Sequence, residues 1–181
     1  MAYTRLSRPN QTWALAYQAA FDDPLDPKVD ELNDRRMVHL FSCALTEDNT
    51  TLTLGDSDTD NTVTFCSRGN ESTPTFQNPT AQLQGLLEKN SGGSGSTPDY
   101  TSLYNKLVAF IGRPDIPYYL ISRTGPDLSQ DVDFTTDHVI KMVQFNTDNP
   151  VLVTDQSAPA QISSTLLYAG GAIAWNIHPS A

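Results

Sequence analysis

The sequence of 181 residues is poor in cysteine, in basic residues and in long apolar runs. It has 2 cysteines, and its 11 Lys and Arg stand against 21 Asp and Glu, which gives a formal net charge of −10. The shortage of positive charge argues against a conventional nucleic-acid reader, because such proteins capture the phosphate backbone with a basic surface. No apolar run approaches the roughly 18 residues that a membrane span needs. We therefore expect no membrane partner and no specific nucleic-acid site.

The same absences bear on where the protein is made. No apolar stretch of a secretory signal follows residues 1–8, so we expect synthesis and folding in a cytoplasm. In such a reducing compartment Cys43 and Cys66 are expected to remain thiols. An acidic chain can still let nucleic acid pass without binding it, because the field of its carboxylates repels a polyanion.

The chain length and its 38% hydrophobic content are typical of one globular domain. Residues 1–33 are expected to form an N-terminal arm, because a connector rich in Asp and Pro within them disfavours regular structure. Trp13 and Tyr17 are the expected contact residues of this arm. The body is predicted to span 34–178, and 179–181 form a short C-terminal tail.

Alternating apolar residues predict strands in the first half of the body. Residues 36–45 are apolar on both faces, as in a strand that is covered on two sides. Residues 51–54 alternate more clearly, which predicts one wet face and a hairpin with the preceding strand. A further strand is predicted within 76–87. Residues 90–96, rich in Gly and Ser, have the composition of a flexible coil.

The second half of the body begins with a helix. Thr97, Pro98 and Asp99 favour a helix start, and apolar residues then recur at helical spacing up to Ile111. Strands are predicted at 116–122, 137–145, 160–168 and 172–177, with a turn joining the last two. One helix, at about 98–111, among seven to nine strands predicts a mainly β protein, a sandwich or barrel with one lateral helix.

A long polar loop interrupts the strands at 54–76. Compact domains rarely carry long connections that neither cover a site nor contact a partner. This loop lacks a nucleophile and base, so contact with a partner is the better interpretation. Asp56, Asp58 and Asp60 have the opening spacing of a Ca²⁺-binding EF-hand, but the glycine and the closing glutamate of that motif are missing, which favours a solvated or partner-facing turn.

The sequence gives only weak support for a zinc site or a hydrolytic active site. His39 and Cys43 could join Cys66 around Zn²⁺, yet the close ligand pairs of zinc sites are missing. No serine stands in a nucleophile-elbow context, and Asp131 and Asp133 would resemble a glycosidase pair only at the right separation. We expect no enzyme, no cofactor and no metal.

Four segments resemble the major tail protein, or tail tube protein, of long-tailed phages, especially those that infect actinobacteria. They are Leu52–Asn61, Gly69–Asn78, Tyr118–Arg123 and Phe145–Pro150. Each segment is short and weak evidence alone. The resemblance rests on the order of the four segments around a central helix. The likeness covers residues 36–178, although the Gly/Ser run at 91–96 departs from it.

The resemblance implies a sandwich that assembles into stacked hexameric rings in the virion tail, around an inner β-barrel that DNA crosses during ejection. It implies contacts with the tape measure protein, the tail terminator and the distal tail protein. The long loop would reach the adjacent ring, so we place Asp56, Asp58, Asp60, Arg68 and Glu71 at ring contacts. Six copies would carry a charge of roughly −60, six times −10, which would keep DNA from the wall.

Two alternatives share much of this pattern. One is the tube protein of a contractile injection machine, which the sequence barely separates from a long-tailed phage tube. The other is a receptor-binding or carbohydrate-binding β-sandwich of a virion. Such a module displays clustered exposed aromatics, whereas Trp13 and Trp175 stand in opposite terminal regions with apolar neighbours.

Overall fold

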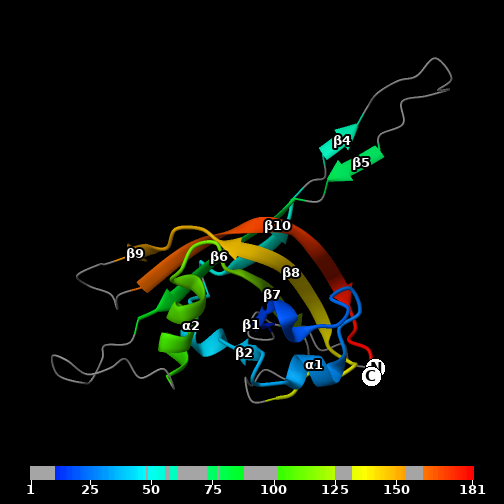
Figure 1. Ribbon diagram of the computed structural model, residues 1–181, viewed down its shortest axis with the longest axis horizontal. Coiled ribbons are helices and arrows are strands. Elements are labelled where there is room, and N and C mark those ends of the chain that lie inside the picture. Colours follow the sequence, from blue (N-terminus) through cyan, green and yellow to red (C-terminus); the bar gives the residue numbers. More distant parts are fainter. Residues whose placement is uncertain are drawn as a thin grey trace, which may run out of the picture.

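The computed structural model is mainly β, as predicted, and its strands pair antiparallel (Figure 1). It describes residues 11–47, 49–55, 58–60, 73–76, 78–87, 102–124, 132–153 and 161–181. The strands are β1 Gln11–Tyr17, β2 Val38–Leu40, β3 Thr51–Leu54, β4 Asp58–Asp60, β5 Thr73–Phe76, β6 Pro79–Leu86, β7 Pro117–Thr124, β8 Val139–Thr147, β9 Val151–Val153 and β10 Gln161–Ile177. The helices are α1 Val29–Asn33 and α2 Leu103–Ile111, with 3₁₀ turns η2 Gln18–Ala20 and η3 Ser42–Ala44.

Eight strands form one sheet in the order β2-β1-β7-β8-β10-β6-β3, and β9 pairs with β10 beside the end of β8. The strands β4 and β5 form a separate pair that stands away from this sheet (Figure 1). The long β10 holds the arrangement together, because β6 pairs with its first part and β8 with the remainder.

Two hydrophobic cores lie on opposite faces of the sheet. The larger core fills the space between the sheet and α2, and includes Leu15, Phe41, Leu83, Tyr118 and Phe145. The second core lies under α1 and the loops beside it, and includes Leu32, Val38, Ile121, Phe134 and Met142. Successive residues of a strand point to opposite faces, so β7 contributes Tyr118 and Leu120 to the first core and Tyr119 and Ile121 to the second.

The predicted lateral helix is present as α2. Ser102 precedes it in an extended conformation, and the helix ends at Gly112, whose amide donates to the Val108 carbonyl at 2.8 Å. Leu107 and Ile111 of the predicted apolar stripe are buried, as is Phe110. The predicted start at residues 97–101 lies outside the described residues.

Residues 36–45 do not form the continuous strand that their pattern predicted. Only β2 is extended, and the chain turns into η3 after Phe41. The backbone of Trp13 holds this bend, because its amide donates to Ser42 Oγ at 2.7 Å and its carbonyl accepts from the Phe41 amide at 2.9 Å. The predicted hairpin is also wrong, since β2 pairs with β1 whereas β3 pairs with β6.

The two C-terminal strands predicted at 160–168 and 172–177 are one strand, β10. The Gly-containing junction between them is a bulge and not a turn, because the register with β8 shifts between Tyr168 and Ile173. Gly170 has φ of 73°, a conformation that glycine adopts at little cost. The glycines here mark an irregularity within one strand. The sequence pattern alone does not distinguish such a bulge from a turn between two strands.

The predicted N-terminal arm is partly a strand of the sheet. Residues 11–17 form β1, which lies between β2 and β7 and pairs with β7 along its whole length. The later part of the predicted arm folds onto the body through α1, and the amide of Val29 donates to the Ser180 carbonyl at 2.9 Å. The predicted C-terminal tail is thus tied to the start of α1. Residues 1–10 lie outside the described residues.

Candidate subunit interface

One half of the sheet, made of β3, β6 and the first part of β10, carries a face without charge. Its inner side packs Leu52, Leu83 and Ile162 into the larger core. Its opposite side, which we call the polar face, consists of hydroxyl and amide residues with two leucines. These residues are Thr51, Thr53, Thr80, Gln82, Gln84, Leu86, Gln161, Ser163, Thr165 and Leu167.

Cross-strand hydrogen bonds connect the side chains of the polar face. The hydroxyl groups of Thr53 and Thr80 lie 2.8 Å apart, and Gln82 Nε2 donates to Ser163 Oγ at 3.3 Å. A further bond runs from Gln84 Nε2 to Gln161 Oε1. None of the residues of the polar face could form an ion pair with a phosphate group, so this surface offers no charge-based attraction for nucleic acid.

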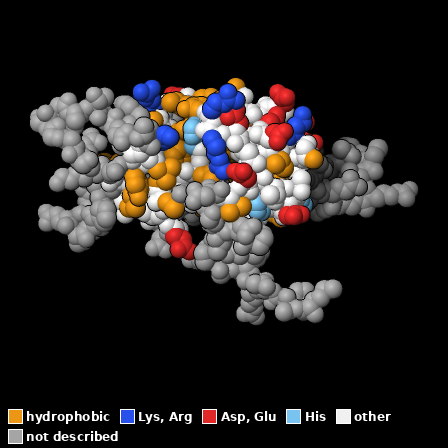
Figure 2. Space-filling model, turned by 90° about the horizontal axis from the view of Figure 1, so that it is seen from below, with side chains coloured by type: hydrophobic (Ala, Val, Ile, Leu, Met, Phe, Trp, Pro, Cys, Tyr) orange, Lys and Arg blue, Asp and Glu red, His pale blue; other side chains and the backbone are white. Residues whose placement is uncertain are grey.

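The charged side chains of the described residues lie on other surfaces. Figure 2 views the molecule from the side of α1 and α2, and Lys, Arg, Asp and Glu are spread over this side. Arg35 and Asp133 form an ion pair there at 2.8 Å, and Arg36 and Asp34 form another at 3.0 Å. The Arg36 side chain and its backbone amide lower the pKa of the partly exposed Asp34 carboxyl.

The half with the polar face also has two open edges. In the described part of the chain β3 pairs with β6 alone, and β9 pairs with β10 alone. Val151, Leu152 and Val153 of β9 are exposed by 60%, 61% and 38%. An exposed apolar edge strand is a template for pairing with another chain. This edge therefore favours association.

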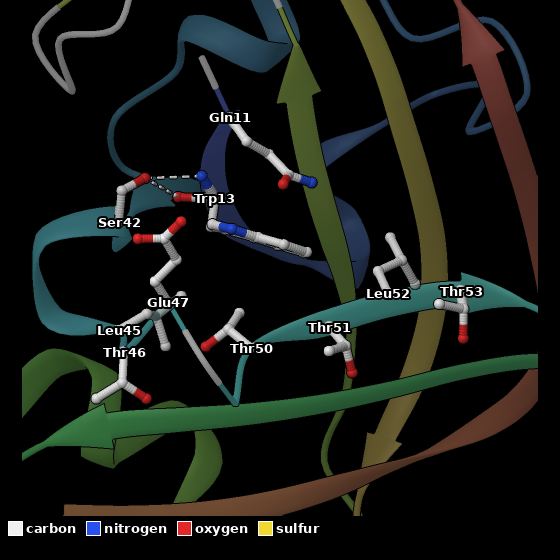
Figure 3. Close-up of a pocket in the computed structure, with 10 residues that line it drawn as sticks. All are labelled: Gln11, Trp13, Ser42, Leu45, Thr46, Glu47, Thr50, Thr51, Leu52 and Thr53. Carbon is white, nitrogen blue, oxygen red and sulfur yellow. Dashed lines mark hydrogen bonds between the residues drawn. The ribbon is translucent and has the colours of Figure 1, made fainter. Parts of the chain in front are cut away.

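A pocket of about 610 Å³ lies beside the other open edge (Figure 3). It is lined by Gln11, Trp13, Ser42, Leu45, Thr46, Glu47, Thr50, Thr51, Leu52 and Thr53. Its back is tied to β6, because Leu45 bridges Gly85 and the Thr46 amide donates to the Gln84 carbonyl at 2.8 Å. Thr50 Oγ1 is buried with no hydrogen-bond partner among the described residues. Such a group is expected to be satisfied by something other than the described residues of one chain.

The predicted contact residues of the arm lie on β1. Trp13 lines the pocket, and the half-exposed Tyr17 packs against Phe110 with ring centroids 4.8 Å apart and the ring planes tilted by 35°. His39 joins this aromatic group, 5.5 Å from Phe110, and burial together with nearby Lys106 lowers its pKa. No group of metal-binding side chains occurs within the described ranges.

The predicted ring contacts are only partly in view. Asp58 and Asp60 lie on β4, and Asp56, Arg68 and Glu71 lie outside the described residues. Sequence reasoning missed β9 and the polar face. The available signal for β9 was the run of three apolar residues directly after Pro150. The signal for the polar face was the alternation of Thr and Gln residues along β3 and β6.

A sheet with one bare face and two open edges is typical of a protein that is completed by further copies or partners. The model of the phage tail tube protein family matches residues 1–177. The chain belongs to this family, and it is a structural protein of a phage tail tube. This membership confirms the expected tail tube protein, in preference to the receptor-binding or carbohydrate-binding alternative.

The fold is similar to that of the SPP1 tail tube, solved by solid-state NMR and cryo-EM, with a TM-score of 0.56. The two chains are 8% identical, and the match covers 96% of this chain and 81% of the other. Comparison with curated protein sequences gave no match. None of the described helices is long and apolar enough to cross a membrane.

Proposed function

We propose that copies of this chain close into hexameric rings, and that the rings stack into the tube through which double-stranded DNA leaves the virion. The open edges of β3 and β9 support this proposal. They are different surfaces of one chain, so a contact between them is heterologous. A heterologous contact produces a ring if its rotation closes and a helical filament if it does not.

Strand direction supports the same contact. The strands β9, β10, β6 and β3 lie side by side and each pair is antiparallel. Four alternating strands leave β9 and β3 running in opposite directions at the two edges. A neighbour rotated about the ring axis keeps its strand directions, so its β3 beside this β9 forms another antiparallel pair. The sheets of successive copies then continue into one barrel without open edges.

The polar face is proposed to line the conduit. Its hydroxyl and amide groups keep the wall wet and carry no cation that would hold a phosphate, in a chain whose net charge is −10. DNA would therefore slide past a neutral wall inside an acidic assembly, whose overall field still repels the polyanion.

The proposal also includes the domain organisation, the place of assembly, the host and the partners of the protein. The chain acts as one structural domain without catalytic activity, assembles in the host cytoplasm, and belongs to a phage of an actinobacterial host. Its partners are its own copies, the tape measure protein, the tail terminator and the distal tail protein. Asp56, Asp58, Asp60, Arg68 and Glu71 contact the adjacent ring, and the arm that contains Trp13 and Tyr17 adds further contacts.

Electron microscopy of the concentrated, purified protein tests the assembly. Hollow rods with sixfold rings are expected, and a monomer at every concentration would contradict the proposal. Arg68→Glu should shorten the rods and lower their yield without changing the circular dichroism of the monomer. Unchanged rod length and yield would count against the ring contact of Arg68 alone.

The conduit is tested by adding a positive charge to the polar face. Rods of Gln82→Lys should retain double-stranded DNA that wild-type rods release, and added salt should reverse this retention because the attraction is ionic. Leu25→Lys is the matched control, since Leu25 is exposed by 59% and lies away from the polar face. Equal retention by both variants would show that the polar face does not meet DNA.

A further inference from the structure

We infer that the pocket beside β3 receives the Leu152 side chain of a neighbouring copy. The inference rests on the ring assembly proposed above and identifies the residue and the cavity that join two subunits. It explains together three features that have no other role among the described residues: the exposed Leu152, the pocket lined by Trp13 and Leu52, and the buried Thr50 hydroxyl.

The pocket lies where a strand is missing. The strand β2 pairs with residues 14–16 of β1 and not with its first three residues. On the other side of the gap, β3 pairs with β6 alone in the described part of the chain. Figure 3 shows the Trp13 ring between η3 and β3, directed toward Leu52. A strand placed along β3 would therefore cover this gap.

Among the three residues of β9, Leu152 is the one whose side chain faces the side of the sheet on which the pocket lies. In β9, Leu152 pairs with Ile162, which belongs to the larger core, whereas Val151 and Val153 pair with Ser163 and Gln161 of the polar face. When β9 continues the sheet beside a neighbour's β3, alternation sends Leu152 to the same side as Leu52. That side is the one on which the pocket opens. The two valines extend the polar face instead.

The chemistry of the pocket suits this occupant. Among the described lining residues Glu47 alone is charged, and it is exposed, so an apolar side chain meets Trp13, Leu45 and Leu52 without burying this charge. The Thr50 hydroxyl can bond to a backbone group of the incoming strand, which would satisfy it. Both partners are present in every copy, so each ring position repeats the same contact.

Truncation of the leucine is the first test. Leu152→Ala should raise the protein concentration needed for rods about tenfold or more, because it removes a buried apolar side chain from each subunit contact. Leu25→Ala is the control, since its side chain is equally exposed in the monomer and should leave that concentration unchanged. Circular dichroism of both monomers checks that the fold persists.

The environment of Trp13 is the second readout. In the Trp175→Phe variant, Trp13 is the remaining tryptophan. Its emission should shift to the blue and lose access to acrylamide when rods form, and Leu152→Ala should restore part of that access. Trp13 that is already protected in the monomer would mean that another occupant fills the pocket, and would overturn the inference.

Cross-linking is the third readout. With Cys43 and Cys66 replaced by serine, Val153→Cys is combined with Thr51→Cys or Thr53→Cys, positions that would meet on the polar face. Disulfides between copies should form in rods and not in monomers. Rods without cross-links, with unchanged assembly of Leu152→Ala, would refute this contact while ring assembly stands. Wild-type protein that forms no rods would refute both.

Discussion

The two halves of the eight-stranded sheet are covered differently. In the half made of β1, β7 and β8, both faces are buried, and six consecutive residues of β7 are buried. In the half made of β3, β6 and the first part of β10, buried and exposed residues alternate. The first half is completed by its own chain, and the second has the surfaces through which we propose that copies associate.

Arg123 illustrates how the covered half, made of β1, β7 and β8, accommodates a buried charge. This arginine is 1% exposed, and its guanidinium donates to the Val132 carbonyl at 2.6 Å and to Thr12 Oγ1 at 3.1 Å. It also lies over the Phe134 ring, 4.9 Å from its centre. A buried charge is tolerated when hydrogen bonds surround it. The stability of the monomer is therefore expected to reside mainly in this half.

The largest effect on the stability of the monomer should come from truncating a buried side chain in the covered half. Ile121→Ala removes a fully buried side chain of β7 and should lower the free energy of unfolding by about 2–5 kcal/mol. Thr165→Ala on the polar face should change it by less than about 0.5 kcal/mol. Urea unfolding of the monomer measures both. Equal losses would show that the two halves contribute alike.

The contact of α2 with the sheet gives the next largest effect. Gly85 lacks a side chain where Leu107 approaches, and a Cβ there would collide with Leu107 Cδ2. Gly85→Ala should destabilise the monomer by about 1–3 kcal/mol through overpacking. Adding Leu107→Val should cost less in the Gly85→Ala background than in the wild type, because the shorter side chain relieves the collision. Strictly additive losses in thermal unfolding would contradict this close approach.

A smaller effect of opposite sign is expected at Tyr118. Its hydroxyl is buried with no hydrogen-bond partner among the described residues, and burial raises its pKa. Tyr118→Phe removes an unsatisfied polar group and should stabilise the monomer by about 1 kcal/mol. Tyr17→Phe at the half-exposed neighbour should be nearly neutral. A destabilised Tyr118→Phe in urea unfolding would mean that the hydroxyl is satisfied.

The smallest expected effect is a pH dependence from His39, at the rim of the covered half. Because burial and Lys106 lower its pKa, the unfolded chain binds more protons near this value. Its contribution to stability is present above the ordinary pKa and is lost as the pH falls toward the folded value. His39→Phe should therefore reduce the loss of unfolding free energy between about pH 7.5 and about pH 5.

Lys106→Gln is the companion variant for this prediction. Removing the positive charge should raise the His39 pKa toward its ordinary value, so part of the acid sensitivity should disappear while the aromatic contacts of His39 remain. If both variants lose stability in acid as steeply as the wild type, other groups dominate the pH dependence of the monomer.

Pattern reasoning located elements well where burial is regular. The strands within 51–54, 76–87, 116–122 and 137–145, and the helix ending at Ile111, follow from alternation and helical spacing. It failed at 36–45 and at β1, where the outcome depends on distant partners. Phe41 and Ser42 bend because the Trp13 backbone holds them, and no local signal in 36–45 encodes that contact.

The candidate interface shows the same division. The acidic composition, the long polar loop and the order of short segments around a helix were sufficient for the amino-acid sequence to indicate the tail tube family, because these features are local or summed over the chain. Which residues share a face, and which strands end as open edges, depends on pairing between distant segments. Only the tertiary structure therefore brought Thr51, Gln82 and Thr165 into one uncharged face and left Leu152 exposed.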